Sequence, residues 1–83
     1  MDSIVKLPRP IAVEPREDFS LVLTFNNGEV RCFDVTPYLA YPAFEALKAS
    51  PFFMQAHIAH HTVVWNDDVD IAPESLYIDS API

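Results

Sequence analysis

Imidazole and carboxylate side chains gather in one stretch of the second half of the chain: His57, His60, His61, Asp67, Asp68 and Asp70. These groups are common protein ligands of zinc and other divalent cations. A small ligand- or metal-binding site made from this stretch is therefore one hypothesis.

The spacing of these residues favours a simpler interpretation. H-x-x-H-H matches no metal-ligand pattern, and neighbouring residues of a strand point to opposite faces, so His60 and His61 would not both bind one ion from a regular strand. The Asn-Asp-Asp-Val-Asp run lacks the glycine and the later glutamate of a calcium loop. We expect a solvated acidic turn, with Asp67 or Asp68 left-handed, and no metal or other cofactor.

Other catalytic signatures need glycines that the chain lacks. Gly28 is the only glycine, whereas a nucleophile elbow, a phosphate loop and a dinucleotide fingerprint each need more than one. Cys32, the only cysteine, is interpreted as a small buried hydrophobe in a reducing compartment. The sequence therefore predicts that the protein is not an enzyme.

Charge is unevenly distributed along the chain. The net charge is −7, and residues 49–83 hold five acidic residues and no lysine or arginine. Because nucleic-acid binding depends on clustered cations, this distribution disfavours direct binding to DNA, RNA or anionic lipid and allows a basic protein as partner. Solubility explains the acidity equally well. No apolar run reaches the roughly 18 residues of a membrane span and no signal peptide is recognised, which favours a cytoplasmic location.

Aromatic residues near the acidic stretch are candidates for a partner-binding surface. Trp65 and Tyr77 are residue types that often anchor interfaces. Phe52 and Phe53 are adjacent, so they cannot both lie on one narrow apolar face of a helix; they are either buried or form an apolar patch for a partner. Core packing is the simpler explanation of the same residues. If the surface exists, the predicted partner-binding set is Phe52, Phe53, Trp65, Asp67, Asp68, Asp70 and Tyr77.

The element that must position these residues is a β-hairpin over residues 19–35. Two alternating apolar runs flank Asn27-Gly28, a strong hairpin signal because a type I′ turn needs positive φ at both central residues. A two-residue loop would pair Asn26 with Glu29 and give a core face made of Phe19, Leu21, Leu23, Phe25, Val30 and Cys32. An isolated hairpin is marginal in water, so it must pack against helices or further strands.

Prolines divide the rest of the chain into short elements. Residues 1–10 are expected to form an extended arm and residues 11–83 a single domain that starts with an edge strand at 11–14. Proline is favoured at the first helical position, so it predicts short helical segments. The predicted elements are helical turns from Pro37, Pro42 and Pro51, a strand from His57, a turn at His60-His61, a strand at 62–65, an extended piece at 69–71, and a helical turn from Pro73 that brings Leu76, Tyr77 and Ile78 onto the core.

Three stretches, taken together, resemble a known family. They are LVLTFNNGEVRCFDVTPYL, FEALKASPFFMQAHI and VVWNDDVDIAPESLY, and they span roughly residues 11–78. The chain is similar to the bacterial domain-of-unknown-function family numbered 2442. The resemblance implies an α+β fold with a small antiparallel sheet and short helices on one side. It carries no catalytic residues, and it implies a short standalone protein of a kind sometimes encoded beside another small protein, as toxin–antitoxin pairs are.

Two hypotheses from different classes follow. The first is a non-enzymatic protein-interaction or regulatory module, the acidic, antitoxin-like member of a two-protein pair. The second is a small ligand- or metal-binding domain that uses His57, His60, His61 and the Asp67–Asp70 turn. Unpaired strand edges would also allow a homodimer.

Overall fold

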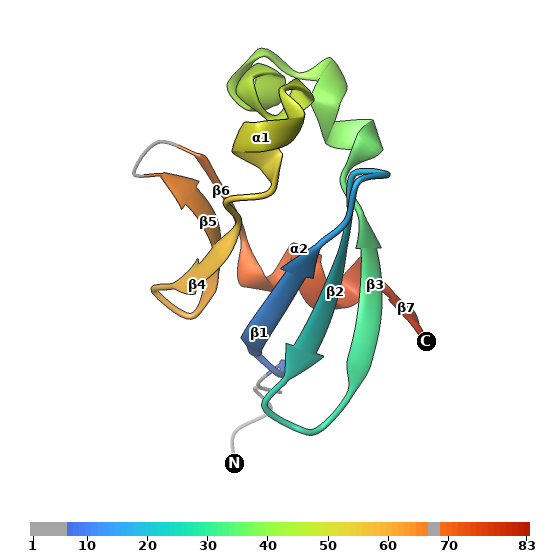
Figure 1. The fold of residues 1–83 in the computed structure, drawn as a ribbon. Coiled ribbons are helices and arrows are strands. Elements are labelled where there is room, and N and C mark those ends of the chain that lie inside the picture. Colours follow the sequence, from blue (N-terminus) through green and yellow to red (C-terminus); the bar gives the residue numbers. More distant parts are fainter. Residues whose placement is uncertain (1–6, 67–68) are drawn as a thin grey trace.

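The computed structural model describes residues 7–66 and 69–83, whose strands form two antiparallel sheets accompanied by short helices (Figure 1). This is the α+β fold predicted from the sequence, although the strands divide into two sheets instead of one. The first sheet has the order β1-β2-β3-β7, with strands Pro10–Pro15, Ser20–Phe25, Val30–Asp34 and Ala81–Pro82. The second has the order β4-β5-β6, with strands His57–Ala59, Thr62–Asn66 and Val69–Ile71.

The predicted hairpin is present as β2 and β3, but its register differs by one residue from the prediction. The Phe25 N–H donates to the Glu29 carbonyl at 2.8 Å, and the Gly28 N–H donates to the Phe25 carbonyl at 2.9 Å. The loop therefore holds Asn26, Asn27 and Gly28, of which Gly28 has a positive φ of 90°. This is the three-residue loop in which a type I turn is followed by a glycine bulge.

The longer loop reverses the two faces of β3. Because side chains alternate along a strand, a slip of one residue exchanges the core face and the outer face. Phe33 pairs with Leu21 and is 1% exposed, and Val35 is fully buried. The prediction that Val30 and Cys32 face the core is wrong, since Val30 is 43% exposed and Cys32 is only half-buried.

Side-chain hydrogen bonds explain why Asn27-Gly28 does not form the tighter turn. Asn27 Oδ1 accepts a hydrogen bond from the Glu29 N–H at 3.0 Å, and the Asn27 amide donates to the Glu29 carboxylate. Asn26 Oδ1 accepts from the Arg9 N–H at 3.1 Å, while the Asn26 N–H donates to the Arg9 carbonyl at 2.8 Å. These bonds stabilise the wider loop and tie it to the residues that lead into β1.

The inner strand β2 lies at the centre of the core. Leu21, Leu23 and Phe25 are fully buried, as predicted. They share one cluster with buried residues from both sheets and from the helices: Phe33, Val35, Leu47, Phe53, Val63, Trp65, Val69, Ile71 and Leu76. The two sheets are therefore joined by a common hydrophobic core.

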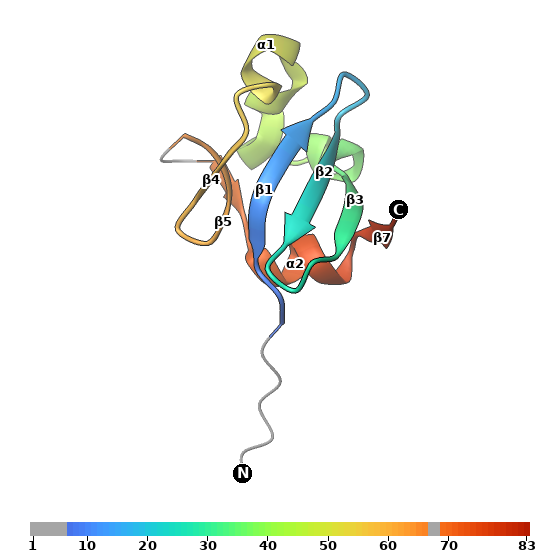
Figure 2. The same ribbon diagram turned by 60° about the horizontal axis from the view of Figure 1, so that its bottom comes forward.

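Every helical segment predicted from a proline is present. The 3₁₀ helices η1 and η2 span Thr36–Ala40 and Pro42–Lys48, and the α-helices α1 and α2 span Ser50–Phe53 and Pro73–Ile78. Each carries proline in its first turn, where the missing N–H would have no helical partner in any case. Figures 1 and 2 show η1, η2 and α1 together at one end of the first sheet and α2 across one of its faces.

The second sheet contains the turn geometry that was expected in the first. Ala59 pairs with Thr62, so His60-His61 is a two-residue loop, and its φ angles of 53° and 65° are both positive. Histidine is among the non-glycine residues that adopt this conformation more often than most. The predicted turn at His60-His61 and the strand after it are confirmed.

Two differences from the prediction concern the C-terminal end of the chain. Leu76 is fully buried and Tyr77 half-buried, but Ile78 is 65% exposed, because residues two apart on a helix do not share a face. The two-residue strand β7 was not predicted, since so short a strand carries no alternation. Residues 1–6 of the predicted arm, and the turn conformation predicted for Asp67 or Asp68, lie outside the described residues.

Two matched valine substitutions test the register of β3. Val35→Ala should lower the free energy of unfolding by about 2 kcal/mol, because it removes two methyl groups from a fully buried site. Val30→Ala should change it by no more than about 0.5 kcal/mol. Urea unfolding measures both free energies. A larger loss of stability for Val30→Ala than for Val35→Ala would indicate the two-residue loop instead.

Candidate functional site

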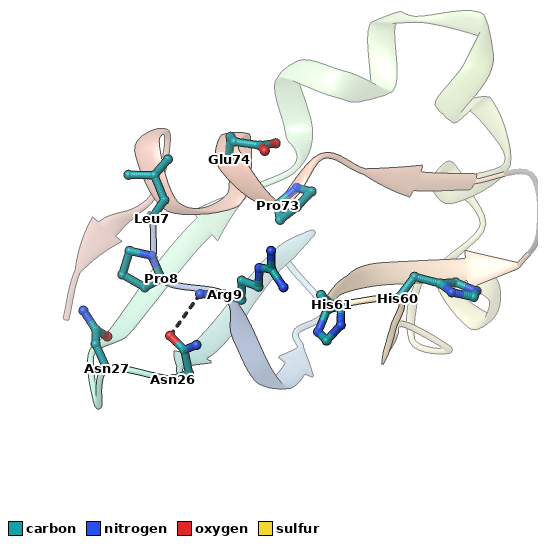
Figure 3. A pocket seen from close by; sticks show the side chains of 9 residues that line it. All are labelled: Leu7, Pro8, Arg9, Asn26, Asn27, His60, His61, Pro73 and Glu74. Carbon is teal, nitrogen blue, oxygen red and sulfur yellow. Dashed lines mark hydrogen bonds between the residues drawn. The ribbon is translucent and has the colours of Figure 1, made fainter. Parts of the chain in front are cut away.

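Four segments that are distant in sequence line a partly open cavity of about 680 Å³. They are residues 7–9 before β1, 26–27 in the β2–β3 loop, 60–61 in the β4–β5 turn, and 73–74 at the start of α2 (Figure 3). Its volume lies within the range of about 300–1,000 Å³ that is usual for small-molecule sites. Because each wall comes from a different element, the cavity is a product of the tertiary fold.

Arg9 supplies the positive charge of the cavity. Its backbone is held on both sides by Asn26, as described above, and its side chain extends between His61 and Pro73 (Figure 3). Within the part of the chain that the structure describes, the guanidinium makes no hydrogen bond or ion pair. A fixed backbone thus presents a guanidinium whose donors are open to a ligand.

Glu74 supplies the negative charge. It lies in the first turn of α2 and is exposed, and Arg9 and Glu74 lie on either side of Pro73 in Figure 3. The two charges form no ion pair with each other. The cavity therefore contains two opposite charges separated by an apolar ring.

A hydrogen-bonded network holds the β2–β3 loop against the C-terminal segment. Arg31 donates to the Ser80 hydroxyl and carbonyl, each at 2.7 Å, and to the Glu29 carboxylate at 3.0 Å. The Tyr77 hydroxyl donates to the same carboxylate at 2.7 Å, and the Arg31 guanidinium lies 4.6 Å from the centre of the Tyr77 ring. This network fixes α2, and therefore Glu74, relative to the loop.

The network also changes the acidity of its members. The pKa of Glu29 lies below its ordinary value, mainly because Tyr77 donates to the carboxylate, and further because Asn27 and Arg31 do. The same Glu29–Tyr77 hydrogen bond raises the pKa of Tyr77, since it favours the protonated phenol. Both shifts favour the charged carboxylate and the neutral phenol that the network requires.

The structure separates the residues of the hypothetical metal site. His57, His60 and Asp70 line a hollow of about 150 Å³ on the outer face of the second sheet, whereas His61 lines the larger cavity. Across residues 7–66 and 69–83, no group of three or more histidine, cysteine, aspartate or glutamate side chains could hold a metal ion. Asp67 and Asp68 lie outside those residues.

Two of the predicted partner-binding aromatic residues belong to the core. Phe53 and Trp65 are 1% and 3% exposed, and the Trp65 indole N–H donates to the Phe53 carbonyl at 2.9 Å. Neither offers side-chain surface to a partner in this conformation. Phe52 and Tyr77 are half-buried.

Of the acidic members of that set, Asp70 is exposed, and Asp67 and Asp68 are not among the described residues. Glu74 and Ile78 were not predicted to lie on a partner surface. Both are exposed and lie four positions apart on α2, so they share one face. Each lies two positions from buried Leu76, and residues two apart on a helix do not share a face, so this spacing could have predicted their exposure.

A family model described as proteins of unknown function (DUF2442) matches residues 10–80. The chain belongs to this family. The match confirms the resemblance carried by the three sequence stretches. It covers nearly the whole length of the 83-residue chain. Comparisons with curated proteins and with solved structures gave no match. Among the described helices, none has the length and apolar character needed to span a membrane.

The lowered pKa of Glu29 predicts a pH-dependent contribution to the stability of this DUF2442 protein. A carboxyl group with a lowered folded-state pKa stabilises the fold fully above its ordinary value, 4.5 for Glu29, and loses that effect as the pH falls through the folded-state value. Glu29→Gln should therefore be less stable than the natural protein near neutral pH, and the difference should shrink as the pH falls below 4.5.

Thermal unfolding across this pH range measures the effect. Glu45→Gln is the matched control, because Glu45 is exposed and is not part of the network; its acid-side profile should follow that of the natural protein. A stability difference between Glu29→Gln and the natural protein that stays constant down to about pH 3 would contradict the role given to this carboxylate.

Proposed function

We propose that this DUF2442 protein is a non-enzymatic interaction module of the bacterial cytoplasm that binds a basic protein, as the acidic member of a two-protein pair. The observation that carries the proposal is the charge of its C-terminal surface. Asp70, Glu74 and Asp79 are all exposed, and none of them forms an ion pair within residues 7–66 and 69–83. Exposed, unpaired carboxylates attract a positively charged partner and raise its association rate.

Exposed apolar surface accompanies these charges. Ile78 is 65% exposed on the same face of α2 as Glu74 and directly precedes Asp79. Interfaces commonly combine an apolar contact, which supplies affinity, with charged groups, which supply specificity. We call Asp70, Glu74, Ile78 and Asp79 the acidic C-terminal surface.

The hydrogen bonding of the perturbed acids supports a role without catalysis. The pKa of Asp18 is lowered chiefly by a hydrogen bond from the Ser20 hydroxyl and also by one from the Ser20 N–H. Glu29 and Tyr77 belong to the network that fixes α2. Each of these groups is therefore explained by local structure, whereas catalytic acids and bases are perturbed by groups that converge on a cleft.

Salt dependence and charge removal test the proposal once a partner has been isolated with the natural protein. A double variant, Asp70→Asn with Asp79→Asn, should weaken binding about twofold to thirtyfold at low salt, because each exposed ion pair contributes roughly 0.2–1 kcal/mol. The binding of the natural protein should also weaken as salt is added.

The matched control removes the same number of charges elsewhere. Glu17→Gln with Glu45→Gln neutralises two exposed acids outside residues 49–83 and should leave the affinity within about a factor of two. Titration calorimetry measures all of these affinities. Equal affinities for the two double variants, or binding that does not respond to salt, would contradict the proposed surface.

A further inference from the structure

Arg9 differs from the other two described arginines in having no carboxylate partner. Arg16 lies 3.9 Å from Glu14, and Arg31 lies 3.0 Å from Glu29. Arg9 instead lines a cavity that Glu74 also lines, and the two do not form an ion pair. In a chain with twelve acidic residues and five basic ones, an unpaired guanidinium held beside a cavity is a candidate ligand-binding group.

The charges in the cavity point to the kind of ligand. Arg9 and Glu74 are the only lysine, arginine, aspartate or glutamate side chains among the described residues that line the cavity, and their opposite charges cancel. The whole protein carries −7, which repels an anion over the distance at which charges act in solution. A ligand that carries one positive and one negative group could pair with both Glu74 and Arg9. Because it has no net charge, the protein would not repel it.

The other walls suit the neutral part of such a ligand. Leu7, Pro8 and Pro73 provide apolar surface, and the Pro73 ring lies between the two charged side chains in Figure 3. His61 lies beside Arg9, where its ring nitrogens can add a hydrogen bond to a carboxylate. The cavity volume of about 680 Å³ leaves room for more than one amino-acid residue.

We propose that this cavity binds a small zwitterion of the amino-acid or short-peptide class. The ligand carboxylate pairs with the Arg9 guanidinium, which can bind it through two parallel hydrogen bonds. The ligand ammonium group pairs with the Glu74 carboxylate, and the aliphatic part between them rests on Pro73. This binding site is additional to the acidic C-terminal surface, and the two share only Glu74.

Titration of the isotope-labelled protein with the dipeptide alanyl-alanine, followed by amide chemical shifts, tests the proposal. We expect saturable shifts that centre on residues 7–9, 26–27, 60–61 and 73–74. N-acetyl-alanyl-alanine lacks the ammonium group and alanyl-alanine amide lacks the carboxylate, so each should bind at least about tenfold more weakly. The absence of saturable shifts in these segments at millimolar dipeptide, or equal binding of either blocked peptide, would overturn the proposal.

Substitutions assign the two charges. Arg9→Gln and Glu74→Gln should each weaken dipeptide binding about tenfold, whereas Arg16→Gln and Glu45→Gln should leave it unchanged. Unchanged amide shifts elsewhere and an unchanged Tm would show that the variants remain folded. Undiminished binding by Arg9→Gln would overturn the site. Arg9 lies outside the acidic C-terminal surface and Asp79 lies outside the cavity, so these two positions distinguish failure of the site from failure of the proposed partner surface.

Discussion

The register of the β2–β3 hairpin is the constraint on which the rest of the structure depends. Because the loop holds three residues, Glu29, Arg31 and Phe33 lie on the same face of the first sheet as the buried side chains of β2. A loop one residue shorter would move all three to the opposite face. Phe33 would then leave the core, and Glu29 and Arg31 would lose their contacts with α2 and the segment after it.

Through this register the hairpin also organises the candidate site. Arg31 and Glu29 hold Tyr77, and with it the helix that carries Glu74 into the cavity and Ile78 onto the outer surface. The same loop clamps the backbone of Arg9 from the other side. A single turn, through its hydrogen bonds, thus positions the two opposite charges of the cavity and the acidic face of α2.

The sequence predicts those secondary-structure elements that the conformational preferences of single residues determine. Proline limits its own φ and removes a donor, so the helical segments η1, η2, α1 and α2 were predicted from single residues. The β-branched and aromatic residues at 62–65 predicted β5. The hairpin register was not predicted, because it depends on bonds between Asn26 and Arg9, seventeen residues away. The cavity could not be predicted, since no pattern links its four segments. Core and interface both favour aromatic residues, so the sequence alone did not decide whether Trp65 was buried.

Interstrand nuclear Overhauser contacts in β2 and β3 measure the register directly. Phe25 and Glu29 are hydrogen-bonded to each other. The non-hydrogen-bonded pairs, whose Cα atoms approach most closely, therefore include Val22–Cys32 and Thr24–Val30. The structure predicts strong Hα–Hα contacts within these two pairs. Strong contacts for Leu23–Cys32 and Phe25–Val30 instead would mean a two-residue loop, and would contradict the placement of α2, the cavity and the acidic surface together.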